Sequence, residues 1–152
     1  MLLAAALLAA GCASPGPPQE KAAPAEARLG EAFTGKSYRV AGMLRTVIRQ
    51  EVFPADTAAY LYLNILDARA GETRINCALF LEGRAIKTIE RPVLQDGDAI
   101  LIIQLTLAGC RSCSGDYRVE IRVNGRLVRE LSFSILPVPL PPLINQAASA
   151  YT

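Results

Sequence analysis

Hydrophobic and polar side chains alternate along most of the chain between residues 57 and 135. In the range 57–67, Leu61, Leu63 and Ile65 fall on one face of an extended chain, and more polar side chains fall on the other. A period of two is typical of strands that are buried on one face. The same pattern predicts further strands over the ranges 73–81, 84–90, 98–107, 117–121 and 127–135. In the fourth strand, the predicted core positions are Leu101, Ile103, Leu105 and Leu107.

Two turns that contain glycine predict hairpins, at Glu82-Gly83 and at Asn124-Gly125. At the second turn, a two-residue loop would mix polar and apolar side chains on both faces of the hairpin. A three-residue loop that starts at Val123 and includes a bulge pairs apolar with apolar, and we predict this register. It gives the following pairs: Ile121 with Leu127, Tyr117 with Leu131, Arg118 with Glu130, and an inward-pointing Arg129 with Val119.

The range 38–53 fits two patterns. An amphipathic helix would place Val40, Met43, Leu44, Val47 and Ile48 on one face. A strand would place Tyr38, Val40, Leu44, Ile48 and Val52 at alternate positions. The many β-branched side chains and the glycine at position 42 favour one long strand that is kinked at Gly42.

Six or seven short strands in about 100 residues, with no clear helix, predict a two-sheet sandwich, with a small barrel as the alternative. The segment from Gly115 to Val119, followed by a hairpin into the last strand, resembles the F–G end of immunoglobulin-like domains. The resemblance covers roughly the range 57–136 and implies that Tyr117 forms a tyrosine corner. The chain has no Trp to match the core Trp of that family. The expected fold class is an all-β, two-sheet antiparallel immunoglobulin-like β-sandwich of about seven strands.

The first eleven residues are uncharged and contain only Met, Leu, Ala and Gly. They are too few for a transmembrane helix, which needs roughly 20 residues, and they are typical of a signal peptide. The segment Leu8-Ala9-Ala10-Gly11-Cys12 resembles the lipobox of bacterial lipoproteins. The resemblance implies cleavage before Cys12 and acylation of its thiol, which would anchor the chain to a lipid membrane. An ordinary signal peptide or an apolar N-terminus with an incidental cysteine is the alternative.

Two further features bear on export. Ala13 follows the cysteine, and in Gram-negative lipoproteins a residue other than Asp favours the outer membrane, so we expect a lipid-anchored envelope protein facing the periplasm. The usual basic residues ahead of the apolar run are missing, which indicates that translation starts further upstream.

Composition sets the remaining domain boundaries. Residues 12–28 are rich in Pro and Ala and should form a disordered tether between the signal peptide, residues 1–11, and a domain at 29–136. Residues 137–152 should form a Pro-rich tail that lies on the domain surface or, as the alternative, binds an SH3-like partner.

Charge and residue content exclude several functions. Sixteen basic and fourteen acidic residues leave a net charge of +2, too neutral for an obvious nucleic-acid binder. The chain has no His, which excludes Ser-His-Asp and Cys-His catalysis and His-ligated metals. We therefore predict no enzymatic activity, no cofactor and no nucleic-acid partner.

The cysteines other than Cys12 carry the sharpest candidate chemistry. Cys110-Arg111-Ser112-Cys113 is a CxxC motif, but a predicted strand follows it where a redox catalyst would have a helix. In an oxidising compartment we expect a Cys110–Cys113 disulfide that closes the loop. Cys77 is expected to be buried and free, with pairing to one of the other two as an alternative. A Cu(I) or Zn site formed by all three thiolates is a further hypothesis, and we predict no metal.

The charged residues offer weaker candidates. Asp96-Gly97-Asp98 is typical of a turn, because two carboxylates are too few for a calcium site. Asp56, Asp67 and Glu72 show no pairing that would support a hydrolase. A predicted basic strip on one outer strand face, either solvated or facing an anionic partner, consists of Arg118, Arg122 and Arg126.

Apolar and aromatic side chains also occupy predicted outer positions. Ile100 and Ile102 lie opposite the core face of their strand, and Tyr60 and Tyr62 share an outer face. Either the N-terminal strand or the Pro-rich tail covers them, or a partner does. The candidate interaction surface comprises Tyr60, Tyr62, Ile100, Ile102, Arg118 and Arg122.

These features together predict a non-enzymatic, membrane-anchored envelope lipoprotein that acts as a protein-interaction or structural module. Its expected partner is an envelope protein. The alternative is a thiol-dependent metal-binding or redox protein that uses Cys110 and Cys113.

Overall fold

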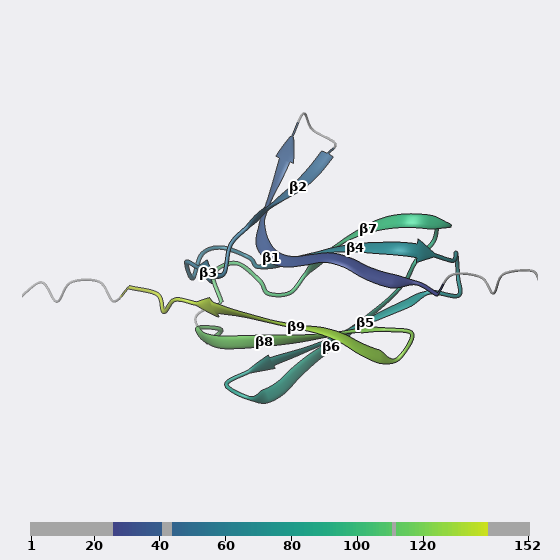
Figure 1. The fold of residues 1–152 in the computed structure, drawn as a ribbon. Coiled ribbons are helices and arrows are strands. Elements are labelled where there is room, and N and C mark those ends of the chain that lie inside the picture. The colour runs from purple at the N-terminus through teal and green to yellow at the C-terminus, as the bar shows by residue number, and fades with distance from the viewer. Residues whose placement is uncertain (1–25, 41–43, 111, 140–152) are drawn as a thin grey trace, which may run out of the picture.

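The computed structural model describes residues 26–40, 44–110 and 112–139. These residues form nine strands (Figure 1). The strands are β1 (Arg28–Val40), β2 (Leu44–Arg49), β3 (Val52–Phe53), β4 (Tyr60–Ala68), β5 (Arg74–Leu81), β6 (Arg84–Pro92), β7 (Gly97–Gln104), β8 (Gly115–Val123) and β9 (Arg126–Ile135). Within this described part of the chain, no helix is long and apolar enough to span a membrane.

Two sheets pack face to face, as Figure 1 shows. Sheet A has the order β2-β1-β4-β7, and sheet B has the order β3-β9-β8-β5-β6. The predicted two-sheet sandwich is confirmed, with nine strands instead of about seven. The difference arises before residue 54, where β1, β2 and β3 occupy a region for which one strand was expected.

The core lies between the sheets and consists of the alternate inner side chains of both. Leu61, Leu63 and Ile65 are fully buried in β4, as predicted, while Tyr60 and Tyr62 on the other face remain half-buried. From sheet B, the most deeply buried inner side chains are Phe53, Ile75, Cys77, Leu79, Val119 and Ile121. Leu107 is an exception to the predicted core face, because β7 ends at Gln104 and the Leu107 side chain is exposed.

The range predicted as one long strand contains a hairpin. The residues are extended, not helical, but β1 and β2 are antiparallel neighbours, with Val40 opposite Leu44. The predicted kink at Gly42 lies outside the described residues. Beyond Gly35, β1 leaves β4 and pairs only with β2, and this part projects from the sandwich (Figure 1). A Cβ atom at Gly35 would overlap the carbonyl oxygen of Ile48, so glycine permits the close approach of β2.

The predicted register of the last hairpin is wrong. Asn124 and Gly125, with φ of 49° and 83°, form a two-residue turn with left-handed backbone at both positions. A bulge then occurs within β9, where Val128 is the extra residue. The bulge shifts the pairing in the direction opposite to the prediction, so that apolar side chains still face one another. The resulting pairs include Tyr117 with Phe133, Val119 with Leu131, Arg118 with Ser132 and Ile121 with Arg129.

Candidate interaction surface

The outer face of sheet A brings four of the predicted surface residues together. The register sets Tyr62 of β4 directly opposite Ile102 of β7, and Ile100 lies one inter-strand pair further along the same face. Tyr60, opposite Gln104, lies on that face as well. The side chain of Ile100 is 60% exposed, and those of Tyr60, Tyr62 and Ile102 are half-buried. These four residues, with Phe33 described next, are called the apolar face below.

Phe33 belongs to the apolar face although the sequence pattern did not identify it. It lies in β1 opposite Tyr62, and the two rings stack with their centroids 4.7 Å apart. The guanidinium of Arg49 in β2 lies 4.9 Å from the centre of the Phe33 ring and bonds the Glu31 carboxylate at 3.0 Å. Small and polar residues surround Phe33 in β1, so its strand gave no period-two signal.

None of the described segments that were expected to cover the apolar face does so. β1 lies beside β4 within sheet A, so it extends the sheet and contributes Phe33. After β9, the amide of Leu136 donates to the carbonyl of Phe53 at 2.9 Å, and the residues up to Pro139 run away from the sandwich (Figure 1). Within the residues described, Ile100 and Ile102 therefore stay accessible.

Arg118 and Arg122 lie on the other side of the molecule, so the predicted six-residue surface is two separate surfaces. Both belong to the outer face of β8 in sheet B. Glu120 lies between them, 3.0 Å from Arg118 and 3.3 Å from Arg122, and Arg118 also reaches Glu130 at 3.4 Å. The predicted Arg118–Glu130 contact thus forms, although as a diagonal pair. These ion pairs compensate the arginines, which leaves little free positive charge for an anionic partner.

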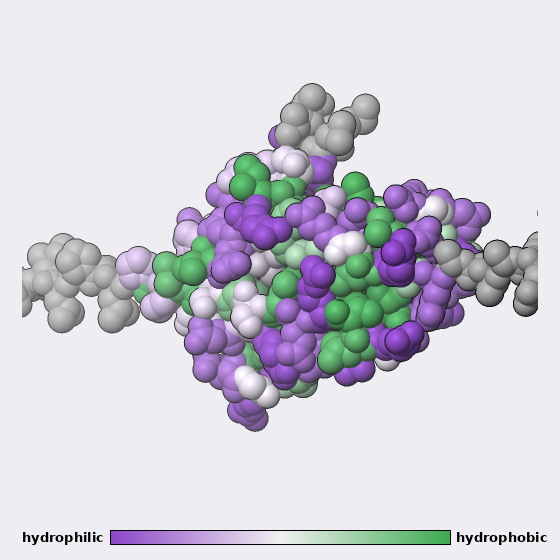
Figure 2. Space-filling model, viewed as in Figure 1, coloured by the Kyte–Doolittle hydropathy of each residue, from purple (hydrophilic) through white to green (hydrophobic). Residues whose placement is uncertain are grey.

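Arg126 does not join that strip. It lies opposite the buried Val123, on the inner side of β9, and pairs with Glu26 at 3.6 Å. Arg126 and Arg129 line a groove of about 530 Å³ where the start of β1 faces β9. Figure 2 shows apolar residues gathered on this side of the sandwich. The groove lets Arg129 reach solvent from an inner position, which explains how an inward-facing arginine is tolerated.

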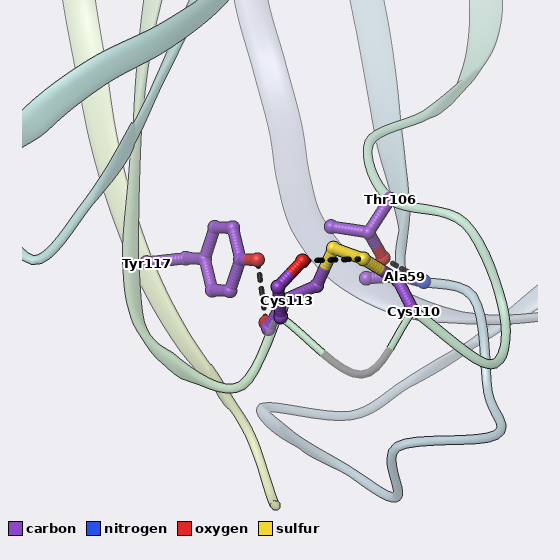
Figure 3. Close-up of a disulfide and its surroundings, with 6 residues drawn as sticks. Ala59, Thr106, Cys110, Cys113 and Tyr117 are labelled. Carbon is purple, nitrogen blue, oxygen red and sulfur yellow. Dashed lines mark hydrogen bonds between the residues drawn. A yellow bond between two sulfur atoms is a disulfide. The ribbon is translucent and has the colours of Figure 1, made fainter.

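The CxxC motif forms the predicted disulfide between Cys110 and Cys113 (Figure 3). The hydroxyl of Tyr117 donates to the carbonyl of Cys113 at 2.6 Å, which is the tyrosine corner that the resemblance implied. The amide of Gly109 donates to Ala55, and Thr106 accepts from the amide of Ala59 at 3.0 Å. The loop therefore joins the two sheets at this end, and β8 begins at Gly115 with no helix between.

Cys77 lies far along the fold from this loop, in the middle of β5. It is fully buried, and its register partners Ile121 and Ile89 are also core residues. Burial raises the pKa of the Cys77 thiol to about 11, so the thiol is protonated at neutral pH. The structure does not bring Cys77 and the disulfide together. Among the described residues, no group of three His, Cys, Asp or Glu is arranged to hold a metal ion.

The other carboxylates that the sequence pattern singled out have structural partners, and Asp56 accepts from the hydroxyl of Thr57 at 3.3 Å. Asp96 accepts the amide of Ala70 at 2.9 Å, and Gly97 has a φ of 84°, so this segment is the predicted turn. Asp67 pairs with Arg28 at 2.8 Å, and Glu72 pairs with Arg69 at 3.7 Å. The predicted lipidation site, Cys12, lies outside the described residues.

Comparison with solved structures finds an immunoglobulin-like protein from Pseudomonas aeruginosa with a TM-score of 0.53 and 17% sequence identity. The match covers 75% of this chain and 99% of that chain. Comparisons with protein-family models and with curated proteins find no match. At this identity the likeness concerns the fold alone. The chain therefore folds as an immunoglobulin-like β-sandwich.

Proposed function

We propose that this protein is a non-enzymatic, lipid-anchored module of the bacterial cell envelope that binds a protein partner through the apolar face of sheet A. The anchor is the acylated Cys12, and Ala13 after it favours the outer membrane, with the domain facing the periplasm. The observation that carries the proposal is the accessible cluster of Phe33, Tyr62, Ile100 and Ile102.

The chemistry of this face supports protein binding. Aromatic and aliphatic side chains are enriched in the centres of protein interfaces, and contiguous exposed apolar surface marks such sites. The stacking of Phe33 on Tyr62 and the Arg49 guanidinium above Phe33 hold the aromatic part in one arrangement. A preorganised surface loses less conformational entropy on binding than a mobile one.

The anchor is tested by replacing Cys12 with Ser. Acyl chains stabilise membrane attachment by about 0.8 kcal/mol per buried CH₂, so their loss should move the protein from the membrane fraction to the soluble fraction. Ser14→Ala, which leaves the cysteine in place, is the matched control. A Cys12→Ser chain that still sediments with membranes after a high-salt wash would refute lipid anchoring.

The binding surface is tested by photo-cross-linking in cells. A photoreactive residue at position 102 should give an adduct with one defined protein, identified by mass spectrometry. The same residue at position 88, on the outer face of sheet B, is the control, because Thr88 is also exposed on an outer strand face. Adducts of equal yield from both positions, or none from position 102, would refute the apolar face as the binding site.

A further inference from the structure

The four outermost strands of the two sheets differ in how they are protected against pairing with another chain. Natural proteins shield such edges with charged side chains, Pro or very short strands. Among the described strands, β3 has two residues, β2 carries Arg45 and Arg49, and β6 carries Lys87 and Pro92. β7 has eight residues, and its only charged side chain is Asp98, near its start. This edge lacks the usual protection.

The main-chain groups of β7 that face away from β4 can be identified from hydrogen bonds at its two ends. The amide of Leu105, just past the strand, donates to the carbonyl of Ala59 before β4, at 2.8 Å. Because the direction alternates along a strand, the odd-numbered residues of β7 bond β4 and the even-numbered ones face outward. In agreement, the carbonyl of Asp98 accepts the side-chain amide of Gln95 at 2.7 Å. The outward-facing backbone groups in the centre of the strand are those of Ile100 and Ile102.

We infer that β7 pairs with β7 of a second copy of this chain, in antiparallel orientation around a two-fold axis at Leu101. This inference rests on the proposed function in so far as it names an occupant for the same apolar face. The register sets Ile100 opposite Ile102 of the second copy and Asp98 opposite Gln104. The outward backbone groups of the two isoleucines then form four main-chain hydrogen bonds across the axis.

The side chains select this register over its neighbours. A shift of the axis to Ile100 would set each Ile102 opposite an Asp98 carboxylate, and a shift to Ile102 would set each Ile100 opposite a Gln104. Only the register centred on Leu101 matches both isoleucines of each strand with isoleucines, and it places no like charges opposite each other. The four isoleucines continue the apolar face, since Ile102 lies beside Tyr62.

The register is tested by cysteine cross-linking between two full-length chains with different tags, made together in one cell. Both carry Cys12→Ser, and one also carries Ile100→Cys while the other carries Ile102→Cys. Directly opposite residues are about 5.5 Å apart at Cα, within disulfide range, whereas diagonal residues are about 7–8 Å apart. The mixture should therefore form a disulfide-linked dimer, and either variant alone should give at most the yield of the Cys12→Ser parent.

Dimer stability is tested by light scattering over a dilution series. Ile100→Arg should raise the dimer dissociation constant by about tenfold or more, because each copy would place a charge against Ile102 of the other. Ile86→Arg on β6 is the matched control, since Ile86 is exposed on an edge strand of the other sheet. It should leave the dissociation constant unchanged, and the melting temperatures of both variants check that they fold.

A parent chain that stays monomeric, or a dimer that neither cross-links in the mixture nor responds to Ile100→Arg, would overturn the inference. The proposed function would survive that result if position 102 still gave a photo-adduct with a different protein. A self-adduct from position 102 together with the mixed disulfide would support the second copy as the occupant.

Discussion

The outer faces of the two sheets differ in the side chains that they present to solvent. On sheet B, Glu120 lies between Arg118 and Arg122 in an ion-pair network, serines of β9 lie beside it, and the Arg118 guanidinium covers the Phe80 ring of β5. On sheet A, the corresponding positions hold the stacked pair Phe33–Tyr62 and the two isoleucines. The inner faces of both sheets are apolar and bury one another, so the sandwich itself does not require an apolar outer face. Because of this difference, we assign the proposed protein-binding site to sheet A.

The largest expected effect concerns the buried core that the two sheets share. Leu63→Ala beneath the apolar face and Ile121→Ala beneath the ionic face each remove a fully buried side chain. Each should lower the free energy of unfolding by about 2–5 kcal/mol, measured by denaturant titration of the Cys12→Ser chain. A loss below about 1 kcal/mol for either variant would show that one inner face is not tightly packed, and the comparison of outer faces would fail.

The second effect is a dependence of stability on pH that arises from the inner face of sheet B. The pKa of the Cys77 thiol is raised from 9.0 to about 11 by burial beneath sheet B. Below pH 9 the thiol is protonated in both states, and above it only the unfolded state ionises readily, so stability falls as pH rises. By pH 11 the loss should be about 2 kcal/mol, and Cys77→Ala should lack this part of the alkaline decline. Parallel declines for both chains would contradict the burial of the thiol.

A third effect tests the Asn124-Gly125 turn, which joins β8 and β9 of sheet B. At Gly125, φ is 83°, and a β-branched side chain is strained in this region by about 1–2 kcal/mol. Gly125→Val should therefore lower the melting temperature, whereas Gly125→Asn should lower it less, because Asn tolerates left-handed backbone. If both variants have the melting temperature of the parent, the assignment of a two-residue turn is wrong.

The sandwich could be predicted from the sequence because every second residue of β4, β5, β7 and β8, on the inner face, is apolar. Most of β1 was not predicted as a strand, because glycine, serine and threonine interrupt the alternation of apolar and polar residues around Phe33. The register of the last hairpin was predicted wrongly because the bulge at Val128 lies within β9. There Leu127 and Val128 are both apolar, so the sequence pattern does not show which of them faces the core. Sequence alone assigned the bulge to the loop.

The candidate surface was predictable only in part. Tyr62, Ile100 and Ile102 stood out because apolar side chains occupied both faces of their strands. Arg118 and Arg122 were assigned to the same surface because alternation tells which face of a strand a residue takes but not which sheet the strand joins. Phe33 could be found only once the pairing of β1 with β4 was known.

A smaller effect distinguishes the forces on the two outer faces. Phe33→Leu removes the stacking on Tyr62 and the contact with the Arg49 guanidinium, and it should cost about 0.5–1.5 kcal/mol in buffer and only slightly less in 1 M NaCl. Glu120→Gln removes the shared partner of two arginines and should cost about 0.2–1 kcal/mol in low salt and almost nothing in 1 M NaCl. Denaturant titrations at both salt concentrations measure the four values. An equal salt dependence for the two variants would mean that the faces are not chemically distinct.

The smallest effect concerns the part of sheet A that projects beyond the sandwich. Arg39 and Arg45 lie directly opposite each other there, and the range 36–49 contains four basic residues and no acidic one. Like charges opposite each other are unfavourable, so Arg39→Glu should stabilise this hairpin by a few tenths of a kcal/mol, seen as slower amide hydrogen exchange in β2. Arg39→Gln, which removes the repulsion without adding attraction, should give about half the gain. Slower exchange in β2 with unchanged exchange in β7 would show that the projecting hairpin and the apolar edge are independent parts of one sheet, whereas faster exchange in β2 would show that the arginines already find compensation.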